Sequence, residues 1–288
     1  MKKVLIGITS KNRAAILPKA INSALNQKYQ PNEVRVYDDC SSDSTAMLVH
    51  EFPAVKWNLS KEEKGYLFAR NQFLSTTDAD YFCSLDDDSW FLNDDYLSAA
   101  VEYMNQNPAV AALAFNILTN DNAGEKKKAF EPVESNNFIG CGHLLRVAPV
   151  KEVGMFSINP GYYGGEEKDL CIRLMDSGYK IMQFPEVEIW HEKTNVSRDI
   201  RRQYRSNVCN DLVFGFRRIP GLILVPVLFY KLLSNFRFSL ITNRKLFIKP
   251  FFNGVLDFLK FLFSRKTNRN AVKMSTYRKF IKLNHSNK

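Results

Sequence analysis

Short apolar runs alternate with segments of helical periodicity along the first hundred residues. The stretch Lys2–Thr9 is a short apolar run with β-branched residues, so it predicts a buried strand. Ala14–Gln27 has apolar residues at helical spacing, and Pro18 must lie in the first turn of that helix. Further strands are predicted at residues 32–39, 55–60 and 80–85, and further helices at residues 44–52 and 66–77. This alternation predicts an α/β fold of three layers with a mostly parallel central sheet.

The alternation continues beyond residue 90. We expect a helix over residues 93–108, a strand over 109–118 and a polar, mobile loop over 119–137. A further helix is expected to open near Gly165 and to end at Gly178, which can supply a left-handed C-terminal residue. A strand then resumes at Tyr179.

Charge is distributed unevenly along the 288 residues, whose net charge is +10. Residues 1–197 contain 20 Lys and Arg against 27 Asp and Glu, a net charge of −7. Residues 198–288 contain 20 Lys and Arg against 3 Asp and Glu, a net charge of +17. Such asymmetry indicates an anionic partner for the C-terminal region, either a membrane surface or a nucleic acid.

The C-terminal region is also apolar. Its longest apolar run, residues 219–230, contains two prolines, and we expect it to be too short and too broken to span a bilayer. Residues 252–266 predict a helix with these apolar residues mainly on one side: Val255, Leu256, Phe258, Leu259, Leu262 and Phe263. With Lys260, Arg265 and Lys266 nearby, the segment is typical of helices that lie in the membrane interface. The alternative is a set of ordinary core helices with solvated basic residues.

The five cysteines are scattered and form no CxxC pair. This spacing argues against a disulfide framework or a zinc site and fits a reducing cytoplasm. The N-terminal apolar run is too short for a signal peptide and no small-residue cleavage site follows it, so it is interpreted as the first strand.

Acidic side chains follow two of the predicted strands. Asp38 and Asp39 end the second strand, and Asp86, Asp87 and Asp88 follow a later one. Neighbouring carboxylates oppose one another's ionisation, whereas a hard divalent cation takes oxygen ligands. In parallel sheets ligands bind at the carboxyl ends of the strands. Because alternate residues of an extended segment face the same way, Asp86 and Asp88 are expected to point together and Asp87 away.

A second acidic cluster lies about eighty residues further on. Glu166, Glu167 and Asp169 fall in the first turn of the predicted helix, where the helix dipole alone would favour them. Two glycines directly before them permit close approach of another group. His191 ends a probable strand; a lone histidine is usually structural, but beside two acidic clusters it is a candidate metal ligand.

The order of these motifs resembles that of the family 2 glycosyltransferases, inverting enzymes of the GT-A fold. The resemblance covers Val4 to Lys193. It rests on five ordered motifs: ITSKNRAAILPKAINSALNQ, VRVYDDCSSDST, KGYLFARNQFLSTTDADYFCSLDDDSW, GMFSINPGYYGGEEKDLCIRLMDSGYKI and IWHEKT. It implies a Rossmann-like α/β/α catalytic domain over residues 1–197, with nucleotide binding in about 1–120 and acceptor and base functions in about 121–197. Residues 198–288 would then form a basic helical tail.

The resemblance also implies roles for individual residues. Those that it assigns to the nucleotide sugar are Thr9, Ser10, Arg13, Asp38, Asp39, Lys64, Arg70, Asn71, Asp86 and Asp87. Asp38 and Asp39 match an acidic pair that accepts the imide N–H of the base. Asp86 and Asp88 match the ends of a DXD motif. Asp88 would be the principal ligand of a divalent cation, Mn²⁺ or Mg²⁺, with Asp86 and His191 beside it.

The catalytic base is expected in the Glu166–Glu167 pair. The family usually has Glu-Asp at these positions, so Glu167, one methylene longer than the usual Asp, takes the place of the base. The implied reaction is inverting transfer of a sugar from a UDP- or dTDP-linked donor to a glycan hydroxyl.

Other readings of the motifs remain open. A metal-dependent nucleotidyltransferase also uses paired carboxylates, but residues 1–197 are net negative, which disfavours a nucleic-acid partner. A non-catalytic sugar-nucleotide-binding protein of the same fold is a further alternative. Processive polymer synthases carry a Q/RxxRW motif, and the nearest match, Arg202–Ser206, lacks the Trp, which favours single addition. With the basic tail, this predicts a cytoplasmic enzyme peripheral to the inner face of the cell membrane, acting on a lipid-linked glycan in surface polysaccharide synthesis.

Overall fold

The computed structural model describes residues 1–30, 32–122, 131–161, 163–192, 199–264 and 267–286. The chain divides into two compact units. The first contains Met1–Phe156 and Ser177–Thr194, and the second contains Ser157–Asp176 and Asn195–Ser286. The helix with the second acidic cluster therefore belongs to the same unit as the C-terminal helices. The domain boundary expected at residue 197 stays a prediction.

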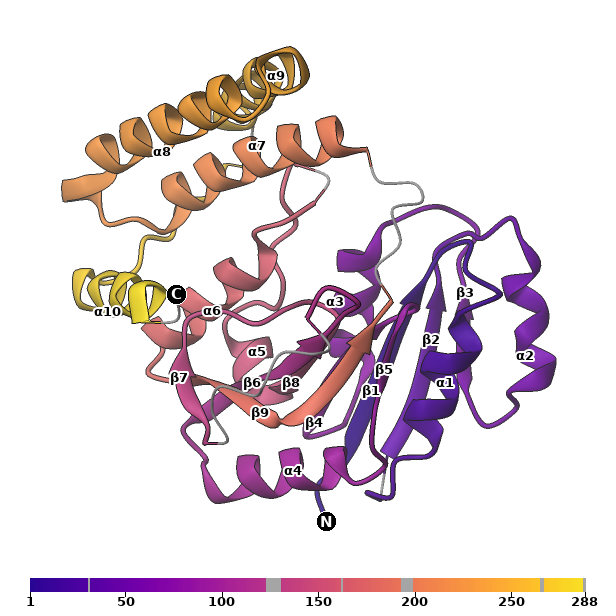
Figure 1. Ribbon diagram of the computed structural model, residues 1–288. Coiled ribbons are helices and arrows are strands. Elements are labelled where there is room, and N and C mark those ends of the chain that lie inside the picture. Colours follow the sequence, from indigo (N-terminus) through magenta and orange to yellow (C-terminus); the bar gives the residue numbers. More distant parts are fainter. Residues whose placement is uncertain (31, 123–130, 162, 193–198, 265–266, 287–288) are drawn as a thin grey trace. The chain divides into compact units, whose positions relative to one another are not determined.

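The first unit is built on a mixed sheet of nine strands among the described residues (Figure 1). The strand order is β3-β2-β1-β4-β8-β6-β9-β5, and β7 pairs with β9 outside this path. The strands are β1 (Val4–Ser10), β2 (Asn32–Asp38), β3 (Lys56–Leu59), β4 (Tyr81–Asp86), β5 (Ser89–Phe91), β6 (Val110–Leu118), β7 (Val133–Ser135), β8 (Gly142–Arg146) and β9 (Lys180–His191).

The predicted α/β fold is confirmed in the N-terminal part of the sheet. Strand β1 pairs in parallel with β2 and β4, and β2 pairs in parallel with β3. Every residue of β1 is buried, as expected for a central parallel strand with both faces covered. Strands β5, β7 and β8 were not predicted. They are short and pair antiparallel, and β8 joins β4 to β6.

The helices of the first unit largely follow the sequence pattern. They are α1 (Leu17–Leu25), the 3₁₀ helix η1 (Ser44–Met47), α2 (Leu48–Glu51), α3 (Tyr66–Thr76), α4 (Tyr96–Gln106) and α5 (Val147–Glu152). Pro18 lies in the first turn of α1, as predicted. The segment predicted as one helix over 44–52 is instead η1 followed by the single turn of α2, and Asp43 caps it by accepting the Thr45 amide at 2.9 Å.

The stretch expected to be one polar loop, residues 119–137, contains a strand. All three residues of strand β7 pair antiparallel with β9. Residues 123–130 lie outside the described part of the chain, so the prediction of a mobile loop there stays a prediction.

The second unit is helical. Its elements are α6 (Glu166–Asp176), α7 (Ile200–Arg218), α8 (Gly221–Ile241), α9 (Arg244–Leu262) and α10 (Met274–Ser286). Helices α7, α8 and α9 run side by side (Figure 1) around a core that includes Tyr204, Val208 and Phe251. Gly254 permits this packing, because a Cβ there would lie 2.6 Å from the Arg205 carbonyl oxygen.

The apolar run of the tail is longer and less broken than expected, whereas the expectation that it does not span a bilayer stays a prediction. Helix α8 continues through Pro226 to Ile241 and is 21 residues long. Among the described residues it is the one helix whose length and composition would suffice to cross a membrane. The apolar residues expected on one side of the helix over 252–266 also differ in burial. Phe258 is buried in the helical core, whereas Leu256, Leu259 and Phe263 are exposed.

Candidate functional site

The register of the parallel strands brings the polar strand ends together. Ser10 is the register partner of Asp38, and Thr9 is the partner of Asp86. All four residues therefore lie at one edge of the sheet, where β1, β2 and β4 end. This is the edge at which parallel α/β sheets bind ligands, as the sequence predicted.

Asp86 is held by a buried arginine. The Arg70 guanidinium, 2% exposed, donates from Nη2 to Asp86 Oδ1 at 2.9 Å and to the Gly140 carbonyl at 3.0 Å. The Thr9 hydroxyl lies 3.5 Å from the same carboxylate oxygen. Arg70 thus offsets the first negative charge of the triplet and fixes its position at the end of β4.

Asp87 turns toward the loop after β1. Its carboxylate accepts the Lys11 amide at 3.2 Å. Burial, together with the charges of Asp88 and Asp86, raises the pKa of Asp87 to about 7. The expectation that Asp86 and Asp88 point together assumed an extended segment through all three aspartates, and that assumption was wrong. Strand β4 ends at Asp86, and Asp87 and Asp88 form a turn before β5.

Asp88 lies beside the predicted histidine. The antiparallel pairing of β5 with β9 places Ser89 opposite His191, which ends β9 as predicted. His191 Nε2 is 3.4 Å from Asp88 Oδ1. Carboxylate oxygen and imidazole nitrogen are both donors for transition-metal ions such as Mn²⁺. The described residues contain no group of three or more His, Cys, Asp and Glu side chains placed to hold a metal, so this pair would need further ligands from a substrate or water.

Asp39 is tied to the loop that enters α3. Its two carboxylate oxygens accept the amides of Lys64 and Gly65 at 2.7 and 2.9 Å. Asp38, its predicted partner, accepts the Ser41 hydroxyl. Each Asp39 oxygen keeps a second lone pair for a further donor. Asp39 therefore shapes the predicted nucleotide edge in addition to any contact with a base.

Asn12 was missed by the sequence analysis. Its amide donates to Ser41 Oγ at 2.8 Å, and its side-chain oxygen accepts the Ser42 amide at 2.7 Å. These bonds join the loop after β1 to the loop after β2. Asn12 has a positive φ of 55°, which asparagine tolerates better than most residues, so an Asn two residues after a buried strand was the available signal.

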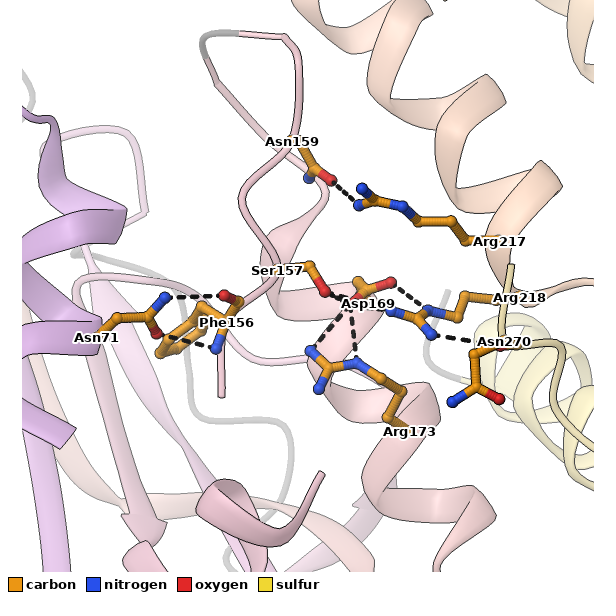
Figure 2. Close-up of polar contacts among 9 residues, drawn as sticks. All are labelled: Asn71, Phe156, Ser157, Asn159, Asp169, Arg173, Arg217, Arg218 and Asn270. Carbon is orange, nitrogen blue, oxygen red and sulfur yellow. Dashed lines mark hydrogen bonds and ion pairs between the residues drawn. The ribbon is translucent and has the colours of Figure 1, made fainter. Parts of the chain in front are cut away.

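Three other residues that were predicted to bind the nucleotide sugar make contacts within the protein. The Asn71 side chain donates to the Phe156 carbonyl at 2.9 Å and accepts the Phe156 amide at 3.0 Å, so it anchors a loop within the first unit (Figure 2). The Lys64 ammonium lies 5.0 Å from the centre of the Phe68 ring. Arg13 stands at the start of α1, where its carbonyl accepts the Leu17 amide at 3.0 Å. Nucleotide contacts by Arg13, Lys64 and Asn71 stay predictions.

In the second unit, Glu166 and Glu167 open α6 as predicted. Glu166 is buried and Glu167 is half-buried. Gly164 and Gly165 before them both have a φ of +91°, the left-handed region that favours glycine. A Cβ on Gly164 would lie 2.8 Å from Asn207 Oδ1 of α7. Within this unit, α7 is therefore the element that approaches these glycines closely.

Asn210 of α7 binds the glycine-rich loop itself. It accepts the Gly161 amide at 2.9 Å, and its side-chain amide donates to the carbonyls of Tyr163 and Gly164 at 3.1 and 2.7 Å. Asn210 is almost completely buried. The loop that leads to Glu166 is thus held by one side chain from a helix some fifty residues further along the chain.

A buried charge cluster around Asp169 also fixes α6 (Figure 2). Asp169 accepts the Ser157 hydroxyl at 2.7 Å, Arg173 Nε at 2.9 Å and Arg218 Nε at 2.5 Å. Burial by itself would raise the pKa of Asp169, but the charges of Arg173 and Arg218 outweigh it and leave the pKa below its ordinary value. Arg218 in turn donates to the Asn270 carbonyl at 3.3 Å.

Comparison with known proteins identifies the family. The model of the family described as glycosyl transferase family 2 matches residues 5–157, more than half of the chain. The chain belongs to glycosyl transferase family 2. The resemblance seen in the sequence is confirmed, and the match covers the sheet edge with Asp38, Asp39 and the aspartate triplet. No curated protein sequence matches the chain.

Solved structures show the same fold. S. aureus TarS, residues 1–349 in complex with UDP-GlcNAc, superposes with a TM-score of 0.67 at 18% identity, covering 90% of this chain and 81% of that chain. GalNAc-T7 with UDP, GalNAc and Mn²⁺ has a TM-score of 0.62 at 14% identity. The match covers 74% of this chain and 48% of that chain. The mannosyltransferase PcManGT from Pyrobaculum calidifontis, with GDP-Man and Mn²⁺, has a TM-score of 0.59 at 14% identity and covers 98% and 79%. The glycosyltransferase family and the GT-A fold are thus established.

Proposed function

We propose that this glycosyltransferase moves a sugar, with inversion, from a UDP- or dTDP-linked donor to a hydroxyl of a lipid-linked glycan in cell-surface polysaccharide synthesis. The observation that carries the proposal is the gathering of Asp38, Asp39 and the aspartate triplet at the carboxyl edge of the parallel strands. The structural neighbours that were solved with UDP-GlcNAc, UDP or GDP-Man support a nucleotide-sugar donor.

The first unit would bind the donor. Asp38 and Asp39 would accept the imide N–H of the base, while their bonds to Ser41 and Lys64 hold the loops on either side. Asp86, oriented by Arg70, would face the ribose. Thr9 and Ser10, at the end of β1, would contact the nucleotide between these groups.

Asp88 and His191 would hold a divalent cation, with Asp86 beside them. Their oxygen and nitrogen donors and their 3.4 Å separation fit Mn²⁺ or Mg²⁺, and such ions are commonly completed by substrate phosphates. A bound cation would stabilise the negative charge that develops on the departing nucleoside diphosphate. The GT-A fold neighbours solved with Mn²⁺ support this assignment.

Glu167 would act as the general base. Its carboxylate would take the proton of the acceptor hydroxyl as the hydroxyl oxygen attacks the anomeric carbon, on the face opposite the diphosphate. Attack on that face inverts the anomeric configuration. Glu167 is half-buried whereas Glu166 is buried, which favours Glu167 as the carboxylate that meets an acceptor.

The base assignment can be tested by label transfer. Sugar-labelled UDP- and dTDP-donors are incubated with the enzyme and a bacterial lipid extract, and label is counted in the butanol-soluble fraction. Glu167→Gln should lower turnover by at least about 100-fold, because general-base catalysis typically contributes that much, while UDP affinity stays unchanged. Glu166→Gln is the matched control. Full turnover of Glu167→Gln would contradict the assignment.

A further inference from the structure

Helices α8 and α9 expose an unusually apolar surface. The large apolar side chains that are exposed on these two helices and directly after α9 are Leu222, Val225, Phe229, Tyr230, Leu233, Phe238, Leu240, Ile241, Phe252, Leu256, Leu259 and Phe263. Leu222 is 92% exposed and Phe263 is 89% exposed. Soluble proteins rarely leave such sets uncovered unless they bind a partner or a membrane. We refer to these twelve residues as the α8–α9 face.

The face is largely distinct from the apolar core of the helical unit, although the Phe238 ring contacts those of the buried core residues Tyr204 and Phe247. Inward-facing side chains such as Phe247, Phe251 and Phe258 already fill the space against α7. Phe252 of α9 reaches α8 as well, because its ring lies 6.4 Å from that of Phe236, a partly buried residue that packs against the core. The two helices therefore leave apolar side chains exposed beyond what their own packing requires.

Exposed basic side chains lie on the same two helices as this face. Arg237, Arg244, Lys245, Lys249 and Lys260 are exposed on α8 and α9. The acidic residues of the same region are engaged elsewhere. Asp211 binds Lys231, Asp257 binds Arg205, and Asp199 caps α7. An apolar surface with basic side chains on the same helices is complementary to an anionic lipid surface, into which apolar side chains insert while Lys and Arg meet headgroups.

The packing of α8 argues against its crossing the bilayer. Lys231, the middle residue of α8, forms an ion pair with Asp211 of α7, and Asn235 bonds the same carboxylate at 3.4 Å. A spanning α8 would carry these partners, and with them the arginine-rich α7, into the hydrocarbon region. Charged groups there are costly. A helix with one side on a polar partner and the other side apolar lies along the interface instead.

We propose that the α8–α9 face inserts into the headgroup region of an anionic membrane, with α8 parallel to the membrane plane. This assigns the membrane contact to one surface and one orientation. This proposal rests on the proposed function in one respect, because an enzyme with a lipid-linked acceptor needs to reach a membrane. Membrane binding itself requires no sugar transfer.

Binding is tested with the full chain and vesicles of phosphatidylcholine with or without 30% phosphatidylglycerol. Wild type should cosediment with the anionic vesicles and much less with the neutral ones. The double variant Lys245→Glu/Lys249→Glu should lose at least about tenfold in affinity, since each basic residue near an anionic leaflet contributes. Phe229→Gln/Leu256→Gln should lose binding as well. Lys180→Glu and Met47→Gln, exposed positions of the first unit, are the matched controls.

Orientation is tested with a single reporter. The three native tryptophans lie outside the C-terminal region, so their signal can be subtracted using wild type. In Phe229→Trp the new indole should shift to the blue on anionic vesicles and be quenched by lipids brominated near the headgroup. Stronger quenching by bromines near the bilayer centre would mean that α8 spans the membrane, and would overturn the proposal.

Two further results would overturn it. Equal binding by the charge-reversed or apolar-face variants and wild type would remove the α8–α9 face from membrane contact. A lipid-free dimer that Phe229→Gln/Leu256→Gln converts to a monomer would mean that a second copy covers the face. UDP binding, measured on the same samples, reports folding and the donor site, so failure of membrane binding stays separable from failure of the proposed function.

Discussion

Single side chains carry much of the order around both acidic clusters. Arg70 fixes Asp86, Asn12 joins two loops, and Asp169 gathers two arginines. Asp169 is the most demanding case, because removing one partner of a buried ion pair leaves the other charge uncompensated. Asp169 lies two residues after Glu167, so the bonds of this cluster hold the first turn of α6 in place.

Asp169→Asn should destabilise the protein by about 3–5 kcal/mol at pH 7, because Arg173 and Arg218 remain buried without their carboxylate. Chemical denaturation of wild type and variant measures this. Asp94→Asn, at an exposed position, should change stability little. A loss of less than about 1 kcal/mol in Asp169→Asn would mean that the cluster is not a stabilising ion pair.

The same carboxylate makes a prediction about pH. Its pKa is lowered in the folded state, so its stabilising effect is fully present above its unfolded pKa of about 4 and is lost as the pH falls through the folded value. The difference in stability between wild type and Asp169→Asn should therefore shrink as the pH is lowered from about 5 to about 2. A difference that stays constant over this range would contradict the lowered pKa.

At the scale of elements, α7 organises the helical unit. It supplies Asn210 to the glycine-rich loop, Arg218 to α6 and Asp211 to α8. None of these three roles was predicted from the sequence, because each depends on a polar side chain that apolar periodicity does not single out. The partners of α7 are also distant in the chain. Asparagine and arginine bonds to remote backbone and carboxylate groups leave no local pattern that a single sequence displays.

Asn210→Ala should lower turnover and leave UDP affinity unchanged. The loop bonded by Asn210 leads directly into Glu166 and Glu167, whereas the proposed donor residues belong to the first unit. The measurement combines the label-transfer assay with UDP titration, and Asn268→Ala, an exposed position, is the control. Unchanged turnover in Asn210→Ala would mean that the loop does not set the position of the base.

For the whole molecule, the sequence predicted what depends on local periodicity. Strands β1, β2 and β4, helices α1 and α3, and the carboxylates at the strand ends all follow from apolar runs and their boundaries. Strands β5, β7 and β8 escaped because three to five residues carry too little pattern, and their pairing partners are remote. The turn at Asp87 and Asp88 escaped because β4 ends one residue after Leu85, where no glycine or proline marks the end.

The site was predicted largely through the family resemblance. Residues and spacing alone singled out Asp38, Asp39, the aspartate triplet, the acidic pair and His191. The contact of Asp88 with His191 then depends on the pairing of β5 with β9, which only the fold provides. The bonds of Asn71 to the Phe156 backbone likewise come only from the fold, and its predicted nucleotide contact stays a prediction.

We propose that Asp88 and its neighbours bind a nucleotide sugar through a divalent cation. Titration calorimetry of UDP and of dTDP, each with and without Mn²⁺, tests it most directly on wild type and Asp88→Ala. We predict that one nucleotide binds wild type in the presence of Mn²⁺, and that this binding is lost without the ion and in the variant. Absence of binding by either nucleotide, or equal binding by Asp88→Ala, would contradict the account.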